Sequence, residues 1–313
     1  MLHWLRGKRD ETLFAGLSLH ADGVAGAVLR TLPDGGVGVE KVCWQPLKHG
    51  ASALDLVPDV LRQCHAISVP LTAVLAPDSY ALVQIEKPDL PEDELQDAMR
   101  WRVKDMVDFP VQEAVIDSFS LPKSRRPGAP ELAYVVAAPQ ETVRQLEDVL
   151  LKRGVELRAI DVPELSLRDL VMHTGVEGRV HAYLYLQQGQ AMIEISAAEE
   201  IFITRHIALA EDLLDLQPED QSAAMESLVL EVQRSLDYFE SQFALGAIDQ
   251  LFVLSTSESA EKTFMHSATV YLTVPVEALS LNSIQGLEKV DQQTQRNVCI
   301  ALGAAIREMP CAA

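Results

Sequence analysis

The sequence from residue 13 to residue 44 is LFAGLSLHADGVAGAVLRTLPDGGVGVEKVCW. Its apolar runs predict strands at residues 13–19, 24–29 and 37–44. Two turn signals separate these runs, Ala21-Asp22-Gly23 and Pro33-Asp34-Gly35-Gly36. Connections of this length join antiparallel neighbours, so the stretch predicts a meander of three antiparallel strands.

The same pattern returns in the second half of the chain, at residues 181–207, HAYLYLQQGQAMIEISAAEEIFITRHI. In each half the meander is followed by a helix and a buried strand. These are predicted at residues 54–65 and 71–76, and again at 223–242 and 250–254. The repeat of element types, without shared residues, predicts a duplicated α/β fold with two lobes. Further predictions are a hinge at 174–178, a strand at 269–274 and a final helix at 294–307.

A separate unit is predicted between the first buried strand and the hinge. Its pattern is strand, helix, strand, strand, helix, strand, and Gly154 gives the second helix its expected left-handed cap. We expect a small inserted α+β subdomain at residues 82–161. Lobe 1 would then be residues 1–81 plus 162–175, and lobe 2 residues 176–313.

Composition excludes several classes of function. The formal net charge of −20 repels phosphate groups, so nucleic acid is not an expected partner. The four cysteines, Cys43, Cys64, Cys299 and Cys311, are scattered, which favours reduced, buried thiols in a cytosolic protein. The sequence contains no apolar run of about 18 residues, so no membrane-spanning helix is expected. The short basic stretch at residues 6–9 is either a frayed terminus or a weak contact with a membrane surface.

Several stretches carry a resemblance to a known family. These are residues 98–110 with Phe109-Pro110, residues 114–119 and 132–138, residues 150–161, the run Arg234-Ser235-Leu236-Asp237-Tyr238, and Ala301-Leu302-Gly303. In this order they resemble the PilM family of type IV pilus assembly proteins, and look most similar to its MshI branch, which serves mannose-sensitive haemagglutinin-type pili. The resemblance implies an actin-like ATPase (ribonuclease H-like) duplicated fold.

The chain departs from the family pattern where actin-like ATPases bind nucleotide. Both Asp-x-Gly turns and the later Gly-Gly pair are replaced, and Glu258 would repel a nucleotide. Glycine permits close approach of backbone to phosphate, and carboxylates hold Mg²⁺. We therefore expect weak or absent ATP binding and no cofactor, with ATP and Mg²⁺ left open. The degenerate nucleotide-site positions are Ser18, His20, Asp22, Gly189 and Ser255.

The resemblance also implies a peptide groove. In PilM proteins the cytoplasmic tail of a PilN-type inner-membrane protein lies between the actin-like lobe and the inserted subdomain. An aromatic anchor and nearby basic residues suit such a tail. The alternatives are core packing for Trp101 and Phe109 and a solvated charged face for Arg100 and Lys104. The corresponding positions here are Arg100, Trp101, Val103, Lys104, Val107 and Phe109.

The sequence contains no HExxH, GxSxG or GxxxxGK[ST] motif, so no catalytic residue is assigned. The family resemblance implies a component of a pilus assembly platform, cytoplasmic and peripheral at the inner membrane, and the departures at the nucleotide site predict that it is a non-catalytic scaffold. Its expected partners are a PilN-like protein and other platform proteins, with a homodimer left open. One alternative is a working ATPase with atypical phosphate loops, and another is a sugar-kinase relative.

Overall fold

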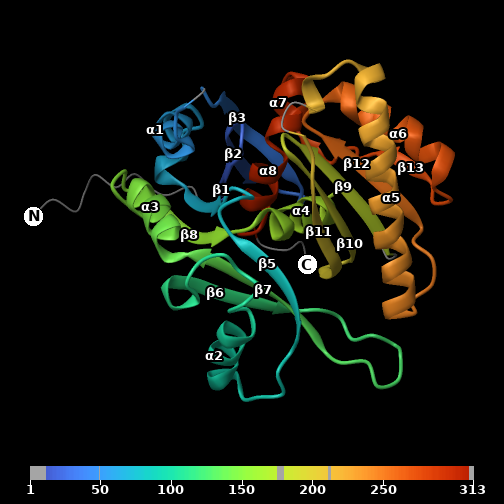
Figure 1. Ribbon diagram of the computed structural model, residues 1–313. Coiled ribbons are helices and arrows are strands. Elements are labelled where there is room, and N and C mark those ends of the chain that lie inside the picture. The colour runs from blue at the N-terminus through green and yellow to red at the C-terminus, as the bar shows by residue number, and fades with distance from the viewer. Residues whose placement is uncertain (1–11, 49, 175–179, 211–212, 310–313) are drawn as a thin grey trace, which may run out of the picture. The chain divides into compact units, whose positions relative to one another are not determined.

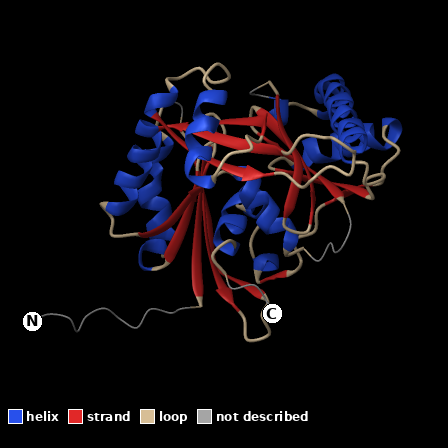
Figure 2. Ribbon diagram, turned by 90° about the horizontal axis from the view of Figure 1, so that it is seen from below, coloured by secondary structure: helices blue, strands red, loops and turns tan. Residues whose placement is uncertain are grey.

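The computed structural model describes residues 12–48, 50–174, 180–210 and 213–309. Most of the predicted hinge at residues 174–178, the basic stretch at residues 6–9 and Cys311 lie outside these ranges. Helices and strands are both abundant, as expected of the α/β class (Figure 2). The chain divides into a first unit, residues 1–77, 144–175 and 280–313, and a second unit, residues 78–143 and 176–279.

The first unit contains a six-stranded sheet in the order β14-β3-β2-β1-β4-β8 (Figure 1). The three strands of the meander are antiparallel to one another, whereas β4 is parallel to β1 and β8 is parallel to β4. This confirms the first predicted meander. The strands are β1 Leu13–Leu19, β2 Gly23–Thr31, β3 Val37–Pro46, β4 Pro70–Val74, β8 Glu156–Asp161 and β14 Ile284–Gln285.

Two glycines allow close helix packing in the first unit. A Cβ atom on Gly16 of β1 would lie 1.9 Å from the Ala301 carbonyl oxygen of α8. A Cβ atom on Gly303 of α8 would lie 1.8 Å from the Ser166 carbonyl oxygen of α4. Only glycine fits at such backbone contacts. The helices of this unit are α1 Ala53–Gln63, α3 Gln140–Leu151, α4 Pro163–Met172, α7 Gln292–Asn297 and α8 Cys299–Ile306.

The second unit contains a five-stranded sheet in the order β11-β10-β9-β12-β13. Apart from the short β14 at the edge of the first sheet, the strands of each sheet lie in the same order when they are numbered along the chain, namely third, second, first, fourth and fifth. The predicted duplication is therefore confirmed. One face of this sheet packs against α5 Pro218–Phe243 and α6 Glu258–Tyr271. The strands are β9 His181–Gln187, β10 Gln190–Ala197, β11 Glu200–Ala208, β12 Gln250–Ser255 and β13 Val276–Ala278.

The inserted subdomain is a three-stranded sheet in the order β5-β7-β6, with one helix against it. It has its own core, to which Met99, Val103 and Val111 contribute. The Tyr134 hydroxyl joins it to β11, donating to the Thr204 carbonyl and accepting from the Thr204 N–H, both at 3.0 Å. Its elements are β5 Ala81–Glu86, α2 Glu92–Arg102, β6 Ala114–Ser120 and β7 Leu132–Pro139.

Three expectations differ from the structure. The last helix and strand expected in the subdomain, most of α3 and all of β8, instead belong to the first unit, where β8 pairs with β4, because periodicity predicts an element but not its neighbour. Residues 269–271, expected in a strand, are the end of α6, and the β-branched residues there are exposed. The final helix is split at Val298 into α7 and α8, and α8 packs in the first unit rather than in lobe 2.

Candidate functional site

The turn between β1 and β2 is filled by its own side chains. The side chains of Ser18 and His20 are buried, and Ser18 Oγ lies 2.8 Å from His20 Nε2 in a hydrogen bond. The His20 ring meets Trp44 of β3 edge to face, with ring centroids 5.3 Å apart. These two positions of the degenerate nucleotide site therefore hydrogen-bond to each other, and His20 also packs against an indole.

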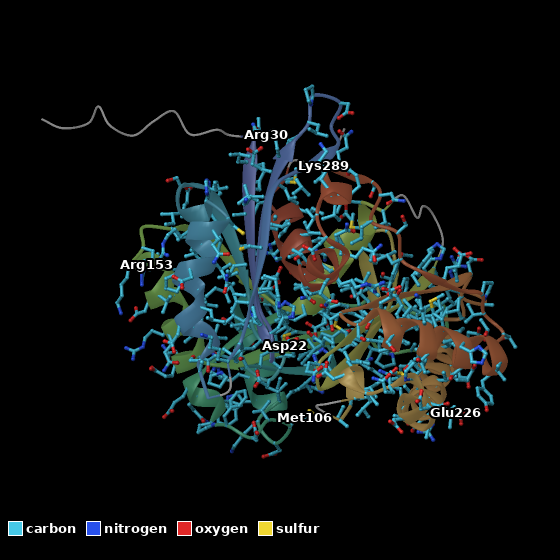
Figure 3. The ribbon with its side chains drawn as sticks, turned by 90° about the horizontal axis from the view of Figure 1, so that it is seen from above. Asp22, Arg30, Met106, Arg153, Glu226 and Lys289 are labelled. Atoms are coloured by element: carbon cyan, nitrogen blue, oxygen red, sulfur yellow. The ribbon has the colours of Figure 1, made fainter. Side chains whose placement is uncertain are left out.

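The same indole occupies the space beside the turn backbone. A Cβ atom on Gly23 would lie 2.4 Å from the Trp44 ring, so the missing side chain makes room for the indole. The carbonyl of Asp22, which lies in this turn (Figure 3), accepts a hydrogen bond from the Leu47 N–H at 2.7 Å. Gly23 thus allows the Trp44 ring to pack against the backbone of this turn.

The turn between β9 and β10 consists of Gln188 and Gly189. Gly189 has a φ of 77°, which explains a glycine in this tight hairpin. Its carbonyl accepts from the Leu209 N–H at 2.9 Å, and Gln188 Nε2 donates to Asp215 Oδ2 at 3.2 Å. Neither residue of the turn is acidic, so the turn itself offers no carboxylate to a metal ion.

The segment after β12 caps the following helix. Ser255 Oγ accepts from the Ser257 N–H at 3.0 Å. Ser257 is the N-cap of α6, and its Oγ accepts from the Ala260 N–H at 3.4 Å while donating to the Leu214 carbonyl at 3.1 Å. Glu258 pairs with Lys262 at 2.5 Å, one helical turn away. The hydroxyl groups that replace the Gly-Gly pair are therefore used in local capping.

Four of the six expected partner-binding residues make contacts within the subdomain. Val103 is buried in the core of the subdomain, and Val107 and Phe109 are partly buried and pack against that core. Arg100 Nη1 donates to the carbonyls of Val111 and Ala114, the second at 2.9 Å, and so ties α2 to the start of β6. These side chains hold the subdomain together.

The other two expected residues, Trp101 and Lys104, lie at the surface. The Trp101 side chain is 63% exposed, and Lys104 Nζ lies 5.4 Å from the centroid of its ring. Because Met99 and Val103 are four residues apart and take the buried face, Trp101 falls about 200° away from Met99 around the helix axis. That offset was a signal in the sequence for the exposure of Trp101.

Met106 was not among the expected partner-binding residues, but it is 59% exposed just beyond the end of α2 (Figure 3). Leu90, directly before α2, is exposed as well. Within the described ranges, no group of three or more His, Cys, Asp or Glu side chains could hold a metal ion. None of the helices described there combines the length and apolar character needed to span a bilayer.

Comparison with known proteins supports the fold assignment. No protein-family model matches the chain, and no curated protein matches it. Among solved structures, the PilM–PilN type IV pilus biogenesis complex is similar with a TM-score of 0.74 and 18% identity, over 95% of this chain and 98% of that one.

Two further solved structures are similar over most of their length. The cytoplasmic domain of EpsL, an inner membrane component of the type II secretion system of Vibrio cholerae, has a TM-score of 0.51 and 12% identity, with coverages of 93% and 94%. A Bacteroides thetaiotaomicron protein of unknown function, with an actin-like ATPase fold, has a TM-score of 0.54 and 11% identity, with coverages of 89% and 94%. Together with the five strands that the two sheets share in the same order, these similarities show that the chain has the actin-like ATPase fold.

Proposed function

We propose that this chain is a non-catalytic docking component of a type IV pilus assembly platform, and that it binds the cytoplasmic tail of a PilN-like inner-membrane protein. The proposal rests on the similarity to the PilM–PilN complex over nearly the whole of both chains. It places the protein on the cytoplasmic side of the inner membrane, held there by its partner. We also propose that the chain belongs to the MshI branch and that it contacts other proteins of the platform.

The exposure of Trp101 is the observation that carries the docking role. The core of the subdomain is complete without this indole, because Met99, Val103 and their neighbours already fill it. Tryptophan is enriched among residues that dominate binding energy at protein interfaces. Lys104, next to the ring, adds a cation that can meet a carboxylate or carbonyl of a bound tail. An apolar anchor beside a cation suits a short peptide with an apolar side chain and an acidic or carbonyl acceptor.

The three degenerate turns support the non-catalytic part of the proposal. Ser18 and His20 bond to each other, the glycine of the second turn is flanked by glutamines, and Ser255 supports the cap of α6. A bound triphosphate needs free backbone N–H groups and a carboxylate-held metal ion. An ATP-binding component of the same platform is the second candidate, which the actin-like ATPase fold itself favours.

The experiment is a calorimetric titration of the full chain with a synthetic peptide, the N-terminal cytoplasmic tail of the PilN-type protein from the same genome. Trp101→Ala is expected to weaken binding at least about tenfold, because a central aromatic anchor contributes about 2 kcal/mol or more. Tyr271→Ala is the matched control, since Tyr271 is also exposed and aromatic but lies on α6.

The control is expected to bind with the wild-type affinity. No binding of the peptide to the wild-type chain would overturn the docking role. Equal affinity of Trp101→Ala and the wild type for the peptide, with both proteins folded by circular dichroism, would show that the surface around Trp101 is not the binding site.

A further inference from the structure

Two buried cysteines from different elements of the first unit lie side by side. Cys43 belongs to β3, and Cys64 is the residue that follows α1. Their Sγ atoms are 2.6 Å apart, and both residues are buried. The sulfur atoms need to approach by only about 0.6 Å to reach the length of a disulfide bond. The pair therefore already has the closeness that a cross-link between β3 and α1 requires.

The neighbouring strand leaves room for the two sulfur atoms. Gly26 of β2 faces them, and a Cβ atom built on it would lie 2.9 Å from Cys64 Sγ and 3.5 Å from Cys43 Sγ. Cys43 Sγ also lies 3.6 Å from the Val60 carbonyl oxygen, to which a thiol can donate. An alanine in place of the glycine would push against the pair. The small residue, the strand and the helix end thus form one enclosed site for two sulfurs.

A metal ion does not explain this site. Two thiolates that bind one tetrahedral zinc ion at about 2.3 Å lie about 3.8 Å from each other, well beyond the separation found here. In the part of the chain that the structure describes, no third metal ligand joins the pair. The short distance between the two Sγ atoms and the lack of a third ligand among the described residues both favour a bond between the sulfurs over a metal site.

We propose that Cys43 and Cys64 are a redox site that forms a reversible disulfide when the chain meets a hydroperoxide. The Cys43 thiolate attacks a peroxide oxygen, which gives a sulfenic acid at Cys43 and releases hydroxide. The Cys64 sulfur then attacks the Cys43 sulfur, the S–O bond breaks, and water leaves. The two thiols are oxidised and one hydrogen peroxide is reduced, which together give one disulfide and two waters.

The surroundings favour Cys43 as the attacking residue. The hydrogen bond from Cys64 lowers the pKa of the Cys43 thiol, and this outweighs the effect of burial. The bond to Cys43 and burial both raise the pKa of Cys64, which keeps its proton until the second step. The thiolate is the nucleophilic form, so the first attack falls to Cys43. A small oxidant is required because both residues are buried.

The disulfide would fasten the end of α1 to the outer strand of the meander. The two residues are 21 positions apart, so the bond closes a loop that lowers the entropy of the unfolded chain. Oxidation is then expected to stabilise the first unit, and a dithiol reductant is expected to reverse this.

The test treats the reduced full chain with hydrogen peroxide, alkylates the remaining thiols in denaturant and maps tryptic peptides. Trypsin places each cysteine on a separate peptide, with Cys43 in residues 42–48 and Cys64 in residues 63–100, because trypsin does not cleave between Lys87 and Pro88. The expected product is a linked pair of these two peptides that dithiothreitol separates. Thermal unfolding is expected to shift upward by about 5 °C on oxidation.

Cys43→Ser is expected to abolish both the linked peptide and the thermal shift. Cys299→Ser is the control, because Cys299 is also buried but bonds to the Gln295 carbonyl at 3.2 Å, and it is expected to keep both. The peptide map of the wild type decides the question even where a variant fails to fold. Alkylation of both Cys43 and Cys64 after peroxide treatment, or a link to another cysteine, would overturn the proposal.

Discussion

Arg307 Nη1 lies 2.6 Å from Asp161 Oδ2, so an ion pair joins the residue after α8 to the end of β8. The other carboxylate oxygen accepts from the Val162 N–H at 2.8 Å. Asp161 is almost fully buried, whereas Arg307 is partly open to solvent. Burial raises the pKa of Asp161, although the Arg307 guanidinium and the hydrogen bonds act in the opposite direction.

Arg307→Ala is expected to destabilise the protein by about 2 kcal/mol at pH 7, because it leaves a buried carboxylate without its cation. This loss of stability is smaller than that expected on breaking a fully buried ion pair, because Arg307 is partly solvated. Without the guanidinium, the pKa of Asp161 in the folded state rises further above its unfolded value. A carboxyl group of this kind favours the folded state at low pH, so the deficit is expected to shrink as pH falls below the folded pKa.

Urea denaturation of the variant and the wild type between pH 5 and pH 8 measures this difference. Arg307→Lys keeps the charge and is expected to lose less stability. A deficit that stays constant over this pH range would contradict the electrostatic explanation.

Arg100 is one of the expected partner-binding residues, and its contacts within the subdomain also predict a contribution to stability. Arg100→Ala removes the hydrogen bonds to the Val111 and Ala114 carbonyls and is expected to cost about 2 kcal/mol. Arg102→Ala is the matched control, since Arg102 is exposed on the same helix and should change stability by less than about 0.5 kcal/mol. Amide hydrogen exchange in β6 checks the effect locally, and equal exchange in the two variants would count against the bracing role of Arg100.

The sequence predicted the meanders well because their signals are local. Turn residues such as Gly35 and Gly189 need a positive φ, and alternation over a few residues defines a strand. The pairing of β8 with β4 was not predictable in this way, since Leu71 and Leu157 are paired across an inserted subdomain. Val270 and Tyr271 were assigned to a strand by propensity, whereas the helix that begins at the Ser257 cap extends through them.

The candidate site was predicted only in part for a similar reason. Composition alone could not decide whether Trp101 or Phe109 enters the core, because both are large apolar residues near one helix end, and the helical offset of Trp101 becomes informative only once Met99 and Val103 are known to be buried. The structure places Phe109 against the subdomain core and Trp101 at the surface. His20 packs against the Trp44 ring, and Ser255 accepts a hydrogen bond from the Ser257 N–H. The nucleotide-site pattern includes neither Trp44 nor Ser257, so it could not predict these contacts.

Gly303→Ala tests the close crossing of α4 and α8. The new Cβ would lie 1.8 Å from the Ser166 carbonyl oxygen, and backbone at that distance cannot yield without moving a helix. We expect a loss of at least about 3 kcal/mol or a failure to fold. Gly36→Ala is the control, because its nearest neighbour is the Asp34 side chain at 3.1 Å in an exposed turn, and equal thermal stability of the two variants would contradict the packing argument.

Titration of the full chain with Mg-ATP is expected to give a dissociation constant weaker than about 100 µM, or no heat beyond that of Mg²⁺ alone. The physical reason lies in the first turn, where Ser18 bonds to His20 and the Trp44 ring takes the space beside Gly23. A phosphate group would have to displace an indole that packs against buried residues. Saturable binding tighter than this limit, lost in Asp22→Ala, would instead support the ATP-binding candidate and would show that the turn rearranges to admit the nucleotide.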